Sequence, residues 1–334
     1  MSSAFEAELI LSRPYLTRKQ ISRAQKNTIS DLRSYSQKKL VIIKYLSDMC
    51  VQLKLPRKTL ETAIYYYERY HLFNAFETEL IYLLATSCLV LSCKQTETLK
   101  KVNEICQVSY KVRKILKANQ DMMETFKKRI WQTELRILES CSFDYRVNNF
   151  LHIDEYIIKI GKSLQLEPNV CYLAWLIAYD VLKSDILLIV PQHCIAIAIL
   201  KISVELFNLQ NDNSANENNN TKWSKVDYSF FETNESSVNE AYFEISNFYI
   251  NTFDICDLQA NIPPNYPHIG IESFIELKQN TGRQRGLGEL ENEDINRDPF
   301  LNNIRSTAVR ERRHVLSSKL VIDEYNAIND TQHK

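Results

Sequence analysis

The segment Leu80–Cys93, with the sequence LIYLLATSCLVLSC, decides the fold because its side chains are apolar or small on every side. A helix without a polar face must be surrounded by other helices, so the segment predicts the central helix of a bundle. Ala85, Ser87 and Cys88 are small enough for neighbouring helices to approach closely. The run ends at Lys94 and falls short of the roughly 20 apolar residues of a membrane span, so no span is predicted.

The flanking sequence has the period of amphipathic helices. Apolar residues at i, i+3 and i+4 predict one amphipathic helix through Ile42, Tyr45, Leu46, Met49, Cys50 and Leu53. Pro56 occupies an N1-like position of the next helix, and a long helix is expected at about 122–141. Of only five glycines, Gly161 alone precedes residue 270, and β-rich or Rossmann-type chains need more of them for turns. The sequence therefore predicts an all-α chain.

The same helical pattern recurs in the second half. Pro168 opens an apolar helix, and after Pro191 the run Cys194–Leu200 is again apolar or small all round. The last long helices of the two halves also end alike, since Glu244–Asp254 repeats the pattern of Glu134–Asp144 at an offset of 110. We predict two tandem five-helix folds, at residues 37–148 and 149–260, after an N-terminal helical extension at 1–36. Residues 208–222 are predicted to be a flexible Asn-rich loop and residues 261–334 a weakly ordered tail.

Charge and cysteine usage narrow the class of partner. The 41 basic and 41 acidic residues cancel, which removes the simplest argument for binding to nucleic acid or a membrane surface, although a local patch could exist. A protein is therefore the expected partner. No signal peptide is recognised in the N-terminal sequence, and the eight cysteines form no C-x-x-C pair. They are expected to be buried thiols in a reducing compartment, without metal or cofactor.

Two ordered motifs carry a family resemblance. The segment Ala85–Glu97 places Lys94-Gln-Thr-Glu97 after the small and apolar run, and Glu134–Asp144 reads Glu-x-x-Ile-Leu-x-x-x-x-Phe-Asp. This set resembles the cyclin box, and Ile195–Leu200 with the residues before it looks like the second fold of transcription-type cyclins. The resemblance spans about 37–258. It is closest to the cyclin subunits of fungal kinases of the RNA polymerase II carboxy-terminal domain, through Arg57–Ala63, Tyr70–Phe73, Phe126–Arg129, Ile137–Asn149 and His152–Tyr156.

The resemblance implies a regulatory subunit without catalytic residues. Such a chain binds and activates a cyclin-dependent protein kinase catalytic subunit that phosphorylates the carboxy-terminal repeat domain of RNA polymerase II and supports transcription elongation. A third, non-kinase subunit belongs to the same complex, and RNA polymerase II is an indirect partner. The expected location is the nucleus, with the cytoplasm also allowed, and direct contact with nucleic acid or membrane is not expected.

Four residues are predicted at the kinase interface: Lys94, Glu97, Glu134 and Ile137. Glu134 shares a helical stripe with Trp131, Leu138 and Cys141, and a carboxylate among apolar neighbours needs a cationic partner. Lys94, at the end of the central helix, is the natural candidate. In cyclins the matching Lys and Glu hold each other and reach the kinase. The alternative is that both are ordinary surface residues, and Glu97 could instead be an acidic residue that starts a helix.

Other functional classes need motifs that this sequence lacks. A general transcription factor of the TFIIB type also has two cyclin-like folds, but it would carry a zinc ribbon with paired C-x-x-C and a strongly basic body. A terpene synthase would carry an Asp-Asp-x-x-Asp cluster. The Gly-rich loop and the His-Arg-Asp and Asp-Phe-Gly motifs of kinases are also missing, so the chain is not predicted to transfer phosphate itself.

Overall fold

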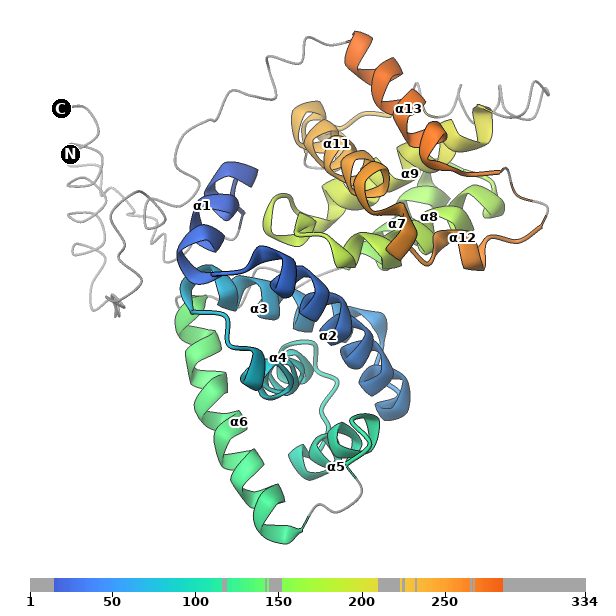
Figure 1. Ribbon diagram of the computed structural model, residues 1–334. Coiled ribbons are helices and arrows are strands. Elements are labelled where there is room, and N and C mark those ends of the chain that lie inside the picture. Colours follow the sequence, from blue (N-terminus) through green and yellow to red (C-terminus); the bar gives the residue numbers. More distant parts are fainter. Residues whose placement is uncertain are drawn as a thin grey trace, which may run out of the picture. The chain divides into compact units, whose positions relative to one another are not determined.

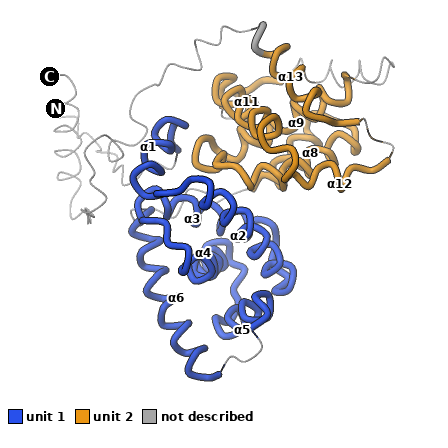
Figure 2. The backbone as a smooth tube through the Cα atoms, viewed as in Figure 1, with its two compact units in different colours: residues 1–149, 294–334 blue, residues 150–293 orange. Residues whose placement is uncertain are grey.

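The computed structural model of the chain describes residues 15–115, 119–141, 143, 152–209, 223, 226–231, 233–264, 266 and 268–284. Every regular element within these ranges is a helix, which confirms the all-α prediction (Figure 1). The described residues fall into two compact units, which we treat separately: unit 1 ends before residue 150, and unit 2 begins there (Figure 2).

Unit 1 is a bundle around helix α4 (Ile81–Gln95). Helix α4 contacts α2 (Leu32–Leu53), α3 (Arg57–Phe73), α5 (Val102–Val112) and α6 (Gln120–Ser140). Ile81 and every residue from Leu83 to Cys93 are buried, so this segment is the central helix that the sequence predicts. Helix α1 (Arg18–Thr28) packs chiefly against α3, and a short 3-10 turn, η1 (Thr78–Leu80), leads into α4.

Side chains of the intervening turns fix where these helices begin. The Asp31 carboxylate accepts hydrogen bonds from the backbone N–H groups of Arg33 and Ser34 at the start of α2. The Asn119 side chain accepts from Met122 N–H at the start of α6, and such caps stabilise a helix by about 1 kcal/mol. Pro56 is the N-cap of α3 and so lies one position earlier than its predicted N1 place.

Buried polar contacts fix how the helices of unit 1 pack. Lys39 Nζ of α2 lies 2.5 Å from Glu68 Oε1 of α3, and both side chains are almost fully buried. The Tyr45 hydroxyl of α2 lies 2.7 Å from the hydroxyl oxygens of Thr86 in α4 and Ser109 in α5. Because a buried charge or hydroxyl that loses its partner is costly, these contacts disfavour other alignments of the four helices.

A buried histidine lies close to these contacts in α3. The His71 ring is only 2% exposed and meets the rings of Tyr35, Tyr67, Tyr70 and Phe76 at centroid distances of 4.9 to 5.4 Å. Burial among these rings disfavours the charged imidazolium and lowers the pKa of His71 to about 3, from 6.5. His71 is therefore neutral in the folded chain at every pH near neutrality.

We expect this histidine to make unit 1 sensitive to acid. In the unfolded chain His71 has a pKa of 6.5, so it binds a proton below that pH. In the folded chain its pKa is about 3, so it stays unprotonated until the pH falls to about that value. The free energy of unfolding therefore decreases as the pH falls from 6.5 toward 3, by up to about 1.4 kcal/mol per pH unit. Denaturant unfolding of the chain at pH 7, 6 and 5 should show a shallower loss for His71→Phe than for wild type. Equal slopes would contradict the assignment.

Unit 2 is built around a second buried helix, α9 (Gln192–Asn208), whose residues Cys194–Leu200 are all at most 1% exposed. Helix α9 contacts α7 (Ile153–Ser163), α8 (Pro168–Asp180), α11 (Glu235–Thr252) and α13 (Ile271–Gln284). Short elements complete the unit: α12 (Leu258–Asn261) and the 3-10 turns η3 (Val181–Lys183), η4 (Ile186–Leu188), η5 (Ser229–Phe231) and η6 (Phe253–Ile255). Gly161 lets α7 approach α8 closely, because a Cβ there would lie 2.6 Å from Cys171 Sγ.

Helix α13 differs from the sequence prediction. Residues 271–284 lie in the segment predicted as a weakly ordered tail, yet they form a helix that packs against α11 and α9. Phe274 is fully buried and stacks on Tyr249 of α11, with ring centroids 4.3 Å apart. The rest of the predicted tail, from residue 285, and residues 210–222 of the predicted Asn-rich loop lie outside the described residues.

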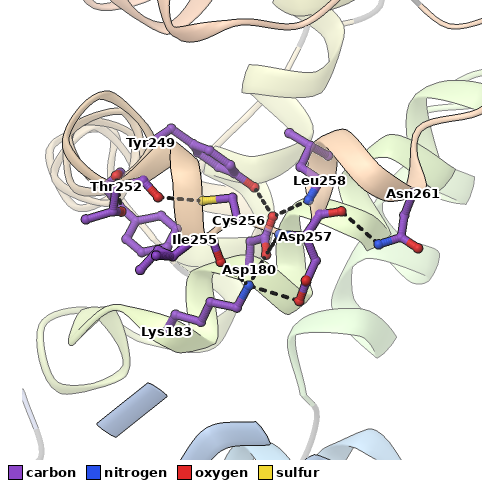
Figure 3. A network of polar contacts seen from close by, with 10 residues as sticks. Asp180, Lys183, Tyr249, Thr252, Ile255, Cys256, Asp257, Leu258 and Asn261 are labelled. Carbon is purple, nitrogen blue, oxygen red and sulfur yellow. Dashed lines mark hydrogen bonds and ion pairs between the residues drawn. The ribbon is translucent and has the colours of Figure 1, made fainter. Parts of the chain in front are cut away.

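A buried carboxylate joins three elements of unit 2 (Figure 3). Asp180, at the end of α8, is fully buried and accepts hydrogen bonds from Asp257 N–H at 2.8 Å and Leu258 N–H at 2.9 Å. The Tyr249 hydroxyl of α11 donates to it at 3.2 Å, and Lys183 Nζ lies 2.8 Å away. Lys183 also donates to the Ile255 carbonyl at 2.8 Å and to Asp257 Oδ2 at 3.0 Å. Asp180 thus ties α8 to the end of α11 and the start of α12.

All eight cysteines are free thiols, and six of them are buried. Burial raises the pKa of Cys93 and of Cys106 to about 11 each. Burial also raises the pKa of the two partly exposed cysteines, Cys171 and Cys256. Among the described residues, no helix is long and apolar enough to cross a membrane.

Candidate functional site

The predicted Lys94–Glu134 pair is present in unit 1. Lys94 Nζ, in the last turn of α4, lies 2.5 Å from Glu134 Oε1 in the second half of α6. The Glu134 side chain is 11% exposed, whereas that of Lys94 is 49% exposed. The carboxylate is thus held against the bundle, while the ammonium group stays open to solvent and to a partner. The lysine also lies at the negative end of the α4 dipole, which favours its charge.

A cluster of hydroxyl groups holds the loop that follows α4. The Thr59 hydroxyl at the start of α3 lies 3.1 Å from that of Thr96 and 2.9 Å from that of Thr98. Thr96 also donates to the Ser92 carbonyl at 2.9 Å, and the Ser92 hydroxyl donates to the Thr59 carbonyl at 2.5 Å. These contacts anchor the loop to α3, so the exposed residue between the two threonines, Glu97, has a defined position.

Glu97 itself adopts a strained backbone. Its φ angle of 57° lies in the left-handed region, which costs a non-glycine residue about 1–2 kcal/mol. The same conformation occurs at Lys54, Lys114 and Gln165, each just after a helix, so at Glu97 it marks the end of α4. Glu97 is exposed and follows Lys94 by three residues in the chain.

Ile137 has a different place from the one that the sequence suggests. It is 0% exposed, because it faces the interior of unit 1 from α6. A side chain without accessible surface cannot touch a partner, so the assignment of Ile137 as a contact residue is corrected: it supports α6 from inside.

Three large apolar side chains are exposed on α6 or beyond the loop that follows α4, and the sequence pattern did not reveal them. Trp131 and Leu135 of α6 are 53% and 51% exposed, and Leu99, beyond the loop, is 73% exposed. Trp131 was expected on the buried stripe of Glu134 but points outward. A signal was available: Trp131 and Leu135 are spaced i, i+4, one position after the buried Ile130 and Glu134.

We call Lys94, Glu97, Leu99, Trp131, Glu134 and Leu135 the α4–α6 surface. Exposed apolar groups beside charged ones are typical of a protein-binding surface. Among the described residues, no group of three His, Cys, Asp or Glu side chains could hold a metal ion. Its exposed apolar and charged groups have the chemistry with which proteins recognise one another.

Comparison with known proteins gives consistent results. The family model for the cyclin N-terminal domain matches residues 12–144. Over 333 residues the chain is 56% identical to the CTD kinase subunit beta of Saccharomyces cerevisiae, and the match covers 100% of both chains. It is 31% identical over 205 residues to the CTD kinase subunit beta of Schizosaccharomyces pombe, with 59% of each chain covered. Human cyclin-K is 25% identical over 167 residues, 49% of this chain and 28% of that protein.

A solved structure is also similar. The crystal structure of the yeast RNA Pol II CTD kinase CTDK-1 complex contains a chain that aligns with a TM-score of 0.81 and 57% sequence identity. The alignment covers 96% of this chain and 100% of that chain. The sequence comparison and the structure comparison thus both relate this chain to a CTD kinase over nearly its whole length.

Proposed function

Because the chain belongs to the cyclin family, we propose that it is the regulatory subunit of a kinase that phosphorylates the carboxy-terminal repeat domain of RNA polymerase II. The observation that carries the proposal is the 56% identity to a CTD kinase subunit beta over the full length of both chains. The chain is a cyclin and not the catalyst, so the kinase subunit performs phosphoryl transfer. A third, non-kinase subunit, a role in transcription elongation and a nuclear location belong to the same proposal. The alternative, a DNA-binding factor of the TFIIB type, has no comparable support.

The physical task of such a subunit is to change the conformation of its kinase. Phosphoryl transfer requires an ion pair between a lysine on a kinase strand and a glutamate of the kinase helix αC. A partner that binds the αC-in state more tightly raises the population of that state. A shift from 1:99 to 99:1 needs about 5.5 kcal/mol of differential affinity. A rigid bundle suits this task, because little binding energy is then spent on ordering the bundle itself.

The α4–α6 surface is our candidate for the kinase interface. Lys94 and Glu134 hold each other at 2.5 Å, so the ammonium group is already oriented toward solvent before a partner arrives. Trp131 and Leu135 provide apolar area on the same helix as Glu134. Aromatic anchors of this kind carry much of the binding energy at protein interfaces. The hydroxyl cluster around Thr59 anchors the loop that carries Glu97 and leads to Leu99.

The apolar part of this surface gives a direct test. The double variant Trp131→Gln/Leu135→Gln should bind the kinase subunit about tenfold more weakly, because two exposed apolar anchors are lost. Titration of the purified kinase subunit with the chain, followed by phosphorylation of a carboxy-terminal-domain peptide, measures both binding and activation. Met122→Gln is the matched control, since Met122 is a 43% exposed apolar residue in the first turn of the same helix.

Two outcomes would count against different parts of the proposal. If the double variant and the Met122→Gln control titrate alike, the kinase contacts another surface. If wild type neither binds the kinase nor raises its activity, the regulatory function itself is wrong.

A further inference from the structure

The charges of this neutral chain are unevenly distributed. Between Arg18 and Lys44 there are eight basic residues and a single acidic one, Asp31, although the whole chain has 41 of each kind. Asp31 is engaged as the N-cap of α2. Lys39 is buried and paired with Glu68, so it adds nothing to the surface. The remaining basic residues make α1 and the start of α2 locally cationic.

Three of these cations lie on exposed positions of α1 and of the first turn of α2. Helix α1 buries Ile21, Ala24 and Thr28 toward α3, and the 100° step per residue places Arg23 and Lys26 on the opposite side. Arg33 follows in the first turn of α2 and is also exposed. We call Arg23, Lys26 and Arg33 the basic surface.

The side chains of the basic surface have no protein partner within the described part of the chain. No ion pair or side-chain hydrogen bond joins Arg23, Lys26 or Arg33 to another described residue. Lys19 of the same helix has a contact of its own and is left out of the definition. Three exposed cations that form no ion pair within the described part of the chain attract an anion that carries several charges.

The residue types on these helices favour a phosphorylated peptide over a nucleic acid. Single-stranded RNA or DNA is bound by cations interleaved with aromatic side chains on which bases stack. The one aromatic residue between Arg18 and Lys44 is Tyr35, and it is buried at 4% exposure. A phosphorylated serine or threonine needs no stacking partner, carries about −1.5 to −2 charges and is bound by Arg and Lys clusters.

We propose that the basic surface binds the phosphorylated carboxy-terminal repeat domain, which is the product of the reaction of the kinase complex. This inference rests on the proposed function, because that function supplies a polyanionic peptide beside this chain. A repeat that is already phosphorylated is then retained by the cyclin subunit while the kinase acts on other repeats of the same molecule. Retention of this kind raises the local concentration of unmodified repeats at the kinase.

The test uses the chain in complex with its kinase subunit. The probes are a fluorescent peptide of several carboxy-terminal repeats, with and without phosphoserine, and a single-stranded RNA of equal charge. The variant Arg23→Gln/Lys26→Gln/Arg33→Gln removes the three charges but retains residues with good helix propensity. The matched control is Lys111→Gln/Lys159→Gln/Lys162→Gln, which removes three exposed charges from α5 and α7.

We expect wild type and control to bind the phosphorylated peptide more tightly than the unphosphorylated one. The basic-surface variant should bind the phosphorylated peptide about tenfold more weakly, which corresponds to three modest ion pairs, and added salt should reduce the difference. The inference is overturned if the variant and the control bind this peptide equally, or if wild type does not distinguish the two peptides. It is also overturned if the variant loses RNA binding but retains the phosphopeptide.

Failure of the proposed function has a separate signature. Phosphorylation of a single-repeat peptide by the wild-type complex measures the regulatory function without any requirement for retention. If the chain does not stimulate this reaction, the proposed function is wrong. If it does and the binding experiment fails, only the role of the basic surface is rejected.

Discussion

Replacing Asp180 by alanine is expected to lower the free energy of unfolding of unit 2 by about 3–5 kcal/mol, the usual range for breaking a buried ion pair. Asp180 is fully buried and accepts two backbone hydrogen bonds, from Asp257 and Leu258. Without it, both N–H groups and the Tyr249 hydroxyl lose their acceptor. Lys183, whose side chain is 8% exposed, would be left with the Ile255 carbonyl and the exposed carboxylate of Asp257.

Denaturant unfolding of the full chain, followed by circular dichroism, measures this loss. Asp254→Ala is a suitable control, because Asp254 is an exposed carboxylate in the neighbouring turn η6, and its removal should change stability by less than about 0.5 kcal/mol. Asp180→Asn should give an intermediate loss, since the amide keeps one acceptor oxygen and presents a donor to the groups that need the other. If Asp180→Ala unfolds at the same denaturant concentration as Asp254→Ala, the network does not hold unit 2 together.

Removal of the Glu134 carboxylate should have the largest effect on the partner kinase. Glu134→Ala leaves Lys94 without its 2.5 Å partner and free to leave the orientation in which a kinase would meet it. Under the proposed interface the bound kinase covers this pair, and truncating one member of a covered, hydrogen-bonded charge pair costs about 2–5 kcal/mol, so kinase affinity should fall at least about 30-fold. Lys94→Ala should act in the same direction, because it leaves the largely buried carboxylate unpaired.

The titration of kinase activity with each variant is the measurement, and circular dichroism checks that helical content is retained. Glu124→Ala is the matched control, because Glu124 forms an exposed pair with Lys127 on the same helix, at 2.6 Å. The exchanged pair Lys94→Glu/Glu134→Lys distinguishes a role of the ion pair in the stability of unit 1 from a role in binding the kinase. It restores the attraction within the chain but reverses the charges that a partner meets. Full activation by the exchanged variant would mean that the pair only stabilises unit 1.

Periodicity and polarity predicted the parts of the fold that depend on one helix at a time. The central helix α4 was predictable because Leu83–Cys93 has no polar face, and such a helix can only be surrounded. The partner of Glu134 was predictable because a carboxylate among apolar residues needs a cation, and Lys94 ends the helix with which α6 packs. The same reasoning gave α9 in unit 2.

Features that depend on helix phase or on distant packing were not predictable in this way. Trp131 was expected on the buried side of α6 and is exposed, whereas Ile137 was expected at an interface and is buried. A small error in the rotational phase of a helix is enough to turn an outward side chain inward. Helix α13 was missed because its stability comes from the contact of Phe274 with Tyr249, which lies in another helix. Prolines and a glycine just before α13 favoured the prediction of an unordered tail.

The burial of the cysteines has a practical consequence for thiol chemistry. The thiolate is the reactive form, and with a pKa of about 11 for Cys93 and Cys106 roughly one thiol in ten thousand is ionised at pH 7. Cys256, with a pKa of about 12, is still less ionised despite its partial exposure. An alkylating dye or crosslinker at neutral pH should therefore react first with a cysteine introduced at an exposed position, such as Gln132 on α6. A variant with one introduced cysteine can therefore be labelled at that position without replacing Cys93, Cys106 or Cys256.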